Sequence, residues 1–262
     1  MKTALPCLPC LVRQGLEAAA FVLKDPADRE RALRETLRSL AKSDLSLSPP
    51  ALAQIIHRRL RAVSGSKDPY RKAKTRSNRL ALEHLPWLRR RVGETRDPLA
   101  LALRLAFAGN VIDLGAFGDL PDAAILREID LAANAPFSGD IEAFRRAARE
   151  ARSILYLADN AGEIVFDRLL IEALGPGRVT VAVRGHPVIN DATRDDAREA
   201  GLEGEVELID NGSDAPGTIL EDCSPAFRER FRAAGLIVAK GQGTAATLSG
   251  VPGRSFFLFK VQ

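Results

Sequence analysis

The chain of 262 residues is poor in several features, and each scarcity excludes a class of protein. Three cysteines are too few for a small secreted domain stapled by disulfides. No apolar run approaches the roughly 18–20 residues of a membrane-spanning helix, and the first residues lack the apolar segment of a signal peptide. Hydrophobic residues make up 46% and charged residues 27% of the chain, which excludes disordered and collagen-like proteins. We therefore expect a globular cytoplasmic protein without a membrane partner.

The net charge of +4 hides an uneven distribution. Residues 1–150 carry 26 Lys and Arg against 18 Asp and Glu, a net charge of +8, whereas residues 151–262 carry 12 against 16, a net charge of −4. This asymmetry is typical of a nucleic-acid-binding part joined to an acidic part. It equally fits a cationic helical part that faces a carboxylate-rich site for an anionic substrate.

The hydrophobic pattern changes character near residue 151. Helical periodicity over residues 1–106 predicts an all-helical domain, with helices at 11–23, 28–40, 51–63, 70–82 and 98–108. Residues 107–150 are expected to connect the two parts at the cleft, with one helix from about 140 to 152. Beyond them, strands at 153–158, 178–183, 205–209, 236–239 and 255–260 alternate with helices at 162–174, 190–200 and 225–234. The sequence therefore predicts an α/β protein in which residues 151–262 form a Rossmann-like three-layer α/β/α domain with a mostly parallel sheet.

Polar residues follow the first four predicted strands. The first strand is followed by the segment from Asp159 to Glu163, and the second by the segment from Arg184 to Thr193. The third is followed by Asp210 and the fourth by Lys240. Ligands of open α/β sheets bind beyond the carboxyl ends of the strands, so we expect the chemistry at this one edge.

The residue types at this edge suit a hard metal ion and a phosphate. Asp159, Asn160 and Asp191 offer oxygen ligands only, which favours Mg²⁺ or Mn²⁺ over zinc. A helix that begins at Gly162 would direct its N-terminal amides into the same space. Lys240, followed by Gly-Gln-Gly, would add a positive charge on a loop that can approach a phosphate closely. The pattern predicts metal-dependent phosphoryl transfer or phosphate hydrolysis.

Each motif taken alone also has a purely structural interpretation. The Asp159 to Gly162 segment could be an ordinary turn, and Asn190 with Asp191 could be the N-cap of the following helix. The loop after Lys240 could be a simple tether. The joint occurrence of these three motifs at strand ends favours a functional site over these structural interpretations.

Three segments in combination resemble the damage-control phosphatase family, formerly domain-of-unknown-function family 89. They are Asp159-Asn-Ala-Gly-Glu163, Gly185-His-Pro-Val-Ile-Asn-Asp-Ala-Thr193 and Ala239-Lys-Gly-Gln-Gly243. The resemblance covers essentially the whole chain. The Cys-X-X-Cys motif of Cys7 and Cys10 is similar to that of the stand-alone prokaryotic subfamily.

This resemblance implies one divalent metal ion (Mn, Mg, Co or Ni) held by Asp159, Asn160 and Asp191. It also implies that Lys240 contacts the substrate phosphate. Members hydrolyse small phosphometabolites such as sugar phosphates and damaged cofactor precursors, so the expected partner is a small anionic phosphorylated substrate. Relatives commonly follow Lys-Gly-Gln-Gly with Asn and an aromatic–acidic pair, whereas this chain has Thr244-Ala245-Ala246. We therefore expect an altered substrate preference.

The leading hypothesis is a metal-dependent phosphatase with a defined set of residues. Glu163 would orient or deprotonate the attacking water, next to the metal ligand Asp159. The residues expected to bind phosphate or to line the substrate rim are Gly162, Asn190, Lys240, Gly241, Asn110 and Asp113.

Three other functions compete with this hypothesis. Residues 58–91 carry 12 Lys and Arg against two acids, but no nucleic-acid-binding motif accompanies them, so a nucleic-acid partner is disfavoured. A nucleotide- or methyl-donor-binding enzyme would need a Gly-rich fingerprint where Asp159 and Asn160 stand. Cys7 and Cys10 could form an accessory metal or redox site.

Overall fold

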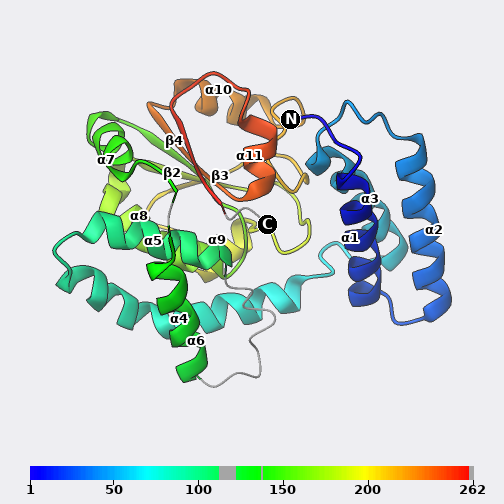
Figure 1. Ribbon diagram of the computed structural model, residues 1–262, viewed down its shortest axis with the longest axis horizontal. Helices are drawn as coiled ribbons and strands as arrows, with labels where there is room; N and C mark the ends of the chain where they lie inside the picture. Colours follow the sequence, from blue (N-terminus) through cyan, green and yellow to red (C-terminus); the bar gives the residue numbers. More distant parts are fainter. Residues whose placement is uncertain (112–121, 137, 260–262) are drawn as a thin grey trace.

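The computed structural model describes residues 1–111, 122–136 and 138–259 (Figure 1). Within them, the part before the sheet is helical. Its helices are α1 (Cys7–Val22), α2 (Pro26–Lys42), α3 (Pro49–Ser64), α4 (Arg71–Glu94), α5 (Pro98–Val111), α6 (Asp122–Asn134) and α7 (Ile141–Glu150). None of the described helices combines the length and the apolar character that crossing a bilayer requires.

Capping residues and prolines set the ends of the N-terminal helices. Asp25 accepts a hydrogen bond from Ala27 N (2.8 Å) at the start of α2, and Pro26 follows in the first turn, where its missing N–H costs nothing. The α3 helix ends at Gly65, whose φ of 64° is the left-handed conformation that glycine adopts readily. The α1, α2 and α3 helices enclose a hydrophobic core of their own.

The second half forms a five-stranded, all-parallel sheet, which confirms the predicted fold class. Its strands are β1 (Ile154–Leu157), β2 (Val179–Val183), β3 (Glu207–Asp210), β4 (Leu236–Lys240) and β5 (Ser255–Leu258). The strand order is β3-β2-β1-β4-β5. The connections change direction between β1 and β4, and this is the point where ligands of such sheets bind.

Helices cover both faces of the sheet because its central strands, β1 and β4, are apolar and buried on both sides. The remaining helices are α8 (Glu163–Leu174), the short η1 (Pro176–Arg178), α9 (Arg194–Glu199), α10 (Pro225–Ala233) and α11 (Gln242–Leu248). Tyr156 belongs to the core shared with α4, α5 and α8. Leu155 and Leu157 belong to the opposite core, which includes Phe227 of α10 and Leu248 of α11. The α4 and α5 helices thus pack directly against the Rossmann-like part.

The structure differs from the sequence prediction at several helices. The α1 helix begins at Cys7, four residues earlier than predicted. The α4 helix continues to Glu94, well beyond the predicted end near residue 82, and contains Pro86; Leu85 and Leu88 on either side of this proline are buried, and this burial offsets the break that proline favours. The α6 helix falls where only a connection was predicted, and α11 follows β4 without having been predicted. The α9 helix begins at Arg194, four residues later than predicted.

Candidate functional site

Backbone pairing joins the ends of the first two strands. Asn160, after β1, forms an antiparallel bridge with Asp191 on the loop after β2. Ala161 N donates a hydrogen bond of 2.8 Å to Asn190 O. These bonds hold Asp159, Asn160 and Asp191 at the carboxyl edge of the sheet, as the sequence predicted. The N-cap of α9 is Thr193 with a complete capping box, so the alternative in which Asn190 and Asp191 cap this helix is wrong.

The loop that carries Asp191 contains a strained residue. Ile189 has a φ of +44°, a conformation that is costly for a β-branched side chain. Asp191 N closes this turn by donating to Val188 O at 3.0 Å. Arg61 of α3 holds the same loop by donating to Pro187 O at 2.7 Å. The helical part of the protein therefore helps to fix the position of Asp191.

Gly241, immediately after β4, lies against the carboxylate of Asp159. A Cβ atom placed on Gly241 would lie 2.0 Å from Asp159 Oδ2, closer than any real contact. Its φ and ψ of 83° and 151° also belong to a region reserved for glycine. The third predicted motif thus reaches the site because a glycine stands at this position.

Arg184 is a residue of the site that the sequence analysis missed. Its side chain is 2% exposed, and it donates from Nε to Asp191 Oδ2 (2.6 Å) and from Nη2 to Asp159 Oδ1 (3.3 Å). Nη2 also lies 3.5 Å from Thr244 Oγ1, so the family departure at Thr244 touches the site. The signal in the sequence was a charged residue directly after the apolar strand Val179–Val183.

Lys240 lies inside the protein, contrary to its expected exposure to the substrate. Its side chain is 0% exposed, and Nζ donates to Glu163 Oε1, to Asp167 Oδ1 (2.6 Å) and to Ala106 O (2.8 Å). Since a lysine ammonium has three donors, these three acceptors use all of them. Asp167 was also missed, although an aspartate within the apolar stretch of α8 is a recognisable signal.

The side-chain amide of Asn160 is oriented by two carboxylates. Its Nδ2 donates to Asp159 Oδ2 and to Glu163 Oε2, both at 3.0 Å. The backbone N–H of Asn160 also donates to Glu163 Oε2, at 3.4 Å. With Nδ2 fixed in this way, Asn160 Oδ1 remains as the amide atom that can accept a metal ion.

The amide of Gly162 has a partner from the helical part of the chain. Gly162 N donates to Asn78 Oδ1 at 2.6 Å. Asn78 is 1% exposed, and its Nδ2 donates to Glu199 at 2.8 Å. Gly162 therefore contributes a hydrogen bond between α4 and the start of α8, which leaves this particular amide unavailable to a phosphate.

The buried charges of the site do not cancel. Four carboxylates and two cations give a net charge of −2 when all are ionised: Asp159, Glu163, Asp167, Asp191, Arg184 and Lys240. Burial raises the pKa of Asp159 well above its usual range, and the neighbouring carboxylates of Asp191 and Glu163 raise it further. Burial also raises the pKa of Asp167 to about 6. Carboxylates held together in this way favour the arrival of a cation.

The donor set fits a divalent metal ion. Asp159, Asn160 and Asp191 supply oxygen atoms from two carboxylates and one amide, and the net charge of −2 matches such an ion. The side chain of Asp159 is 14% exposed, which leaves the site open at one side. No group of three or more His, Cys, Asp and Glu side chains that could hold a metal ion occurs in the described part of the chain.

Among the described residues, the remaining predicted ones add no side-chain hydrogen bond to this cluster, and two of them fall partly or wholly outside the described structure. Asn190 is exposed and uses its carbonyl oxygen in the loop pairing. Asn110 lies near the end of α5, but its side chain is outside the described part, and Asp113 is outside the described residues altogether. Cys7 is half-buried, Cys10 is exposed, and both are free thiols in the first turn of α1.

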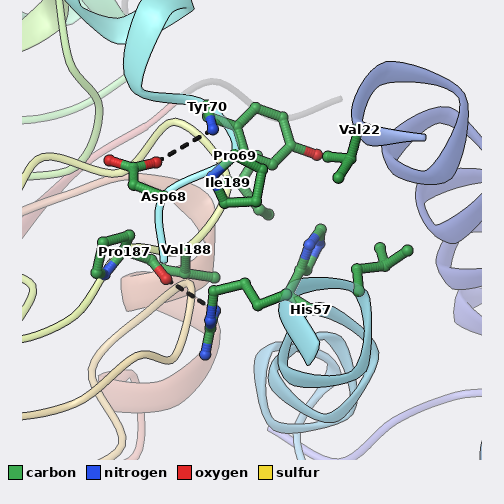
Figure 2. A pocket seen from close by; sticks show the side chains of 10 residues that line it. Val22, His57, Asp68, Pro69, Tyr70, Pro187, Val188 and Ile189 are labelled. Atoms are coloured by element: carbon green, nitrogen blue, oxygen red, sulfur yellow. Dashed lines mark hydrogen bonds between the residues drawn. The ribbon is translucent and has the colours of Figure 1, made fainter. Parts of the chain in front are cut away.

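A small cavity lies next to the strained loop (Figure 2). His57, Tyr70 and Ile189 contribute to its lining, and its volume is about 10 Å³, enough for one water molecule. Burial lowers the pKa of His57 to about 4. The cavity is too small for a substrate.

Several cations of the basic 58–91 stretch join the two parts of the molecule. They pair with carboxylates of the α/β part; these cations are Arg58, Arg61, Arg71, Lys74 and Arg89. Because these charges are already paired within the protein, the stretch offers less positive charge to a nucleic acid than its composition suggests.

The chain is similar to two proteins named damage-control phosphatases and to one uncharacterised protein. It is 32% identical to a damage-control phosphatase of Pyrococcus horikoshii, over 100% of this chain and 92% of that protein. It is 34% identical to a damage-control phosphatase of Archaeoglobus fulgidus, over 95% of this chain and 88% of the relative. An uncharacterised protein of Methanocaldococcus jannaschii is 32% identical, over 93% of this chain and 82% of its own length.

A solved structure and a family model agree with these relatives. The crystal structure of a DUF89 family protein from Pyrococcus horikoshii has a TM-score of 0.92 and 31% sequence identity, covering 99% of this chain and 92% of the other. Residues 3–262 match the model of the damage-control phosphatase ARMT1-like domain. The chain therefore belongs to the damage-control phosphatase ARMT1-like family.

Proposed function

We propose that the protein hydrolyses small phosphometabolites, such as sugar phosphates or damaged cofactor precursors, with one divalent metal ion. Membership of the damage-control phosphatase family makes it a phosphatase. The observation that supports the finer proposal is the pair of carboxylates Asp159 and Asp191 beside the oriented amide of Asn160, in a cluster of net charge −2. Mn²⁺, Mg²⁺, Co²⁺ and Ni²⁺ are the candidate ions.

Asp159, Asn160 and Asp191 would hold the metal ion. When bound, the ion would act as a Lewis acid towards the phosphoryl group and lower the pKa of a coordinated water. Arg184 holds the two carboxylates together against their mutual repulsion, through the bonds of 2.6 and 3.3 Å. The protein would therefore offer the metal ion a preformed set of oxygen ligands at the carboxyl edge of the sheet.

The contacts of Glu163 support a role in orientation. One of its oxygens accepts from Lys240 and the other from the backbone and side-chain amides of Asn160. A general base needs an oxygen within hydrogen-bonding reach of the water it deprotonates. We therefore assign Glu163 to holding Asn160, in place of the base function that its position in the motif had suggested.

The substrate preference is expected to depend on the segment after Gly241. Thr244 is buried and contacts Arg184, and the family resemblance implies an asparagine at this position. A threonine hydroxyl reaches less far than an asparagine amide, so a contact towards the substrate would be lost here. We expect weak turnover of common model phosphates and better turnover of a narrower set.

The test is hydrolysis of a panel of small phosphate esters by chelator-treated protein, with each metal ion added singly. Phosphate release should require metal and should fall by at least about 100-fold in Asp191→Asn, which removes one ligand charge. Asp195→Asn is the matched control, since Asp195 lies nearby on α9 but is exposed and bonded only to Arg198 among the described residues. Metal-independent hydrolysis, or equal activity of Asp191→Asn and Asp195→Asn, would refute the metal-dependent mechanism.

A further inference from the structure

Lys240 is completely enclosed by acceptors that belong to the protein. Its Nζ donates to Glu163 on α8, to Asp167 one turn further along the same helix (2.6 Å), and to Ala106 O on α5 (2.8 Å). Tyr156 on β1 donates to the same oxygen of Asp167 at 2.7 Å. Each of these side chains is at most 1% exposed.

This buried group is connected to a proposed metal ligand by one further residue. Glu163 accepts from Lys240 through Oε1 and from Asn160 through Oε2. A displacement of Lys240 would therefore move Glu163, and with it the carboxylate that orients the amide of Asn160. The chain of contacts runs from Asp167 through Lys240 and Glu163 to Asn160.

Stability alone does not account for such a group. Burying charged residues is energetically costly, and replacing a buried ion pair by apolar residues is often neutral or stabilising. A buried network has a clear use when it fixes the orientation of another residue. Asp167 lies on α8 and Lys240 lies at the end of β4. Their ion pair therefore fixes the positions of this helix and this strand relative to the site.

We propose that Asp167 and Lys240 are positioning residues, which hold Glu163 and through it orient Asn160 towards the metal ion. The proposal rests on the metal-dependent function above and assigns Lys240 a task other than contact with the substrate phosphate. Asp167 keeps one of the three donors of Lys240 occupied and balances part of its charge. Without Asp167, Lys240 would draw Glu163 towards itself and away from Asn160.

The two assignments of Lys240 predict different measurements. If Lys240 contacts the phosphate, its loss raises the KM of a phosphate ester and weakens inhibition by inorganic phosphate, while the affinity for metal is unchanged. If Lys240 positions Asn160, its loss weakens metal binding, while the KM measured at saturating metal is unchanged. Loss of an outer partner of a metal ligand typically changes metal affinity about 10- to 100-fold.

The experiment compares Asp167→Asn, Lys240→Met and the double variant in the full-length protein. The dissociation constant of Mn²⁺ is measured by calorimetry on chelator-treated protein, and kcat and KM on an ester that the wild type hydrolyses. Glu172→Gln is the matched control, because it removes one carboxylate from the same α8 helix at an exposed ion pair with Arg89. Circular dichroism checks folding, and Tyr156→Phe replaces Lys240→Met if that variant does not fold.

We expect about tenfold weaker Mn²⁺ binding in Asp167→Asn, with unchanged KM at saturating Mn²⁺ and no change in Glu172→Gln. The double variant should bind Mn²⁺ about as tightly as whichever single variant binds it more weakly, because both changes break the same chain of contacts. If the losses of Mn²⁺ affinity in the two single variants multiply in the double variant, or if KM rises while Mn²⁺ affinity is unchanged, the positioning role is overturned but the proposed function is not. A wild type that binds none of Mn²⁺, Mg²⁺, Co²⁺ and Ni²⁺ would overturn the proposed function as well.

Discussion

The replacement Gly241→Ala tests the geometry of the site with a single methyl group. The new Cβ would lie 2.0, 2.2 and 2.5 Å from Oδ2, Cγ and Oδ1 of Asp159. Since the whole carboxylate is in the way, Asp159 must leave its position and its bonds to Arg184 and Asn160. The backbone conformation costs a further 1–3 kcal/mol or so for a residue with a side chain. We expect Mn²⁺ affinity to fall about 100-fold and the Tm to fall by several degrees.

The control for this prediction is Gly204→Ala. Gly204 has a φ of +86°, almost equal to the +83° of Gly241, but nothing lies within 4 Å of its added Cβ. The positive φ should therefore lower the Tm of Gly204→Ala, whereas its Mn²⁺ affinity should stay that of the wild type. Calorimetric titration with Mn²⁺ and thermal unfolding of both variants separate the two effects. Wild-type Mn²⁺ affinity in Gly241→Ala would show that Asp159 does not bind the metal from the position seen here.

Three further predictions concern the residues around the site. Asn78→Ala should lower the free energy of unfolding by about 1–3 kcal/mol, because it leaves the amide of Gly162 buried without an acceptor; urea unfolding that matches the wild type would contradict this. Burial alone would raise the pKa of Asp214, but hydrogen bonds from Arg58 and Gln54 lower it to about 2. Ionised Asp214 should therefore contribute on the order of 1–2 kcal/mol to the free energy of unfolding, after screening at the half-exposed Arg58. This contribution should be present above about pH 4 and lost as the pH falls from 4 to 2. Urea unfolding of Asp214→Asn should not show this loss of stability in acid. Arg184→Met should destabilise the metal-free protein by about 3–5 kcal/mol, and Mn²⁺ should raise its Tm by more than that of the wild type, because the ion replaces the lost charge; equal shifts would show that Arg184 does not hold the carboxylates.

Local patterns predicted the sheet because each strand is defined by its own residues. Short apolar segments such as Ile154–Leu157 and Val179–Val183 are bounded by polar residues and glycine, and such segments form strands in any parallel sheet. The α4 helix escaped prediction beyond residue 82 because Pro86 is locally unfavourable there. Only packing of Leu85 and Leu88 against the core, which involves distant parts of the chain, makes the longer helix stable.

The same distinction holds within the site. The types of residue at the strand ends, such as Asp159 and Asp191, could be predicted from the sequence and the general topology of open sheets. The direction in which Lys240 points could not, because its three acceptors lie 73 to 134 positions away in the chain. The pairing of Asn78 with Gly162, which are 84 positions apart, was hidden for the same reason. Hydrogen-bond partners at this separation leave no local signal.

The structure also changes where substrate contacts should be sought. The donors that the sequence offered to a phosphate, namely Lys240 and the amide of Gly162, are bonded to groups of the protein, and the additional cation Arg184 is bonded to two carboxylates. Without a metal ion, the fully ionised cluster carries a net charge of −2 and repels a phosphate dianion, since two like unit charges 4 Å apart cost about 4 kcal/mol at an effective dielectric constant of 20. The buried residues therefore suit a cation, and we expect selectivity among phosphate esters to come from exposed side chains at the rim, such as Asn190 and Gln242. Variation of these two positions should then change which ester is hydrolysed while metal binding is retained.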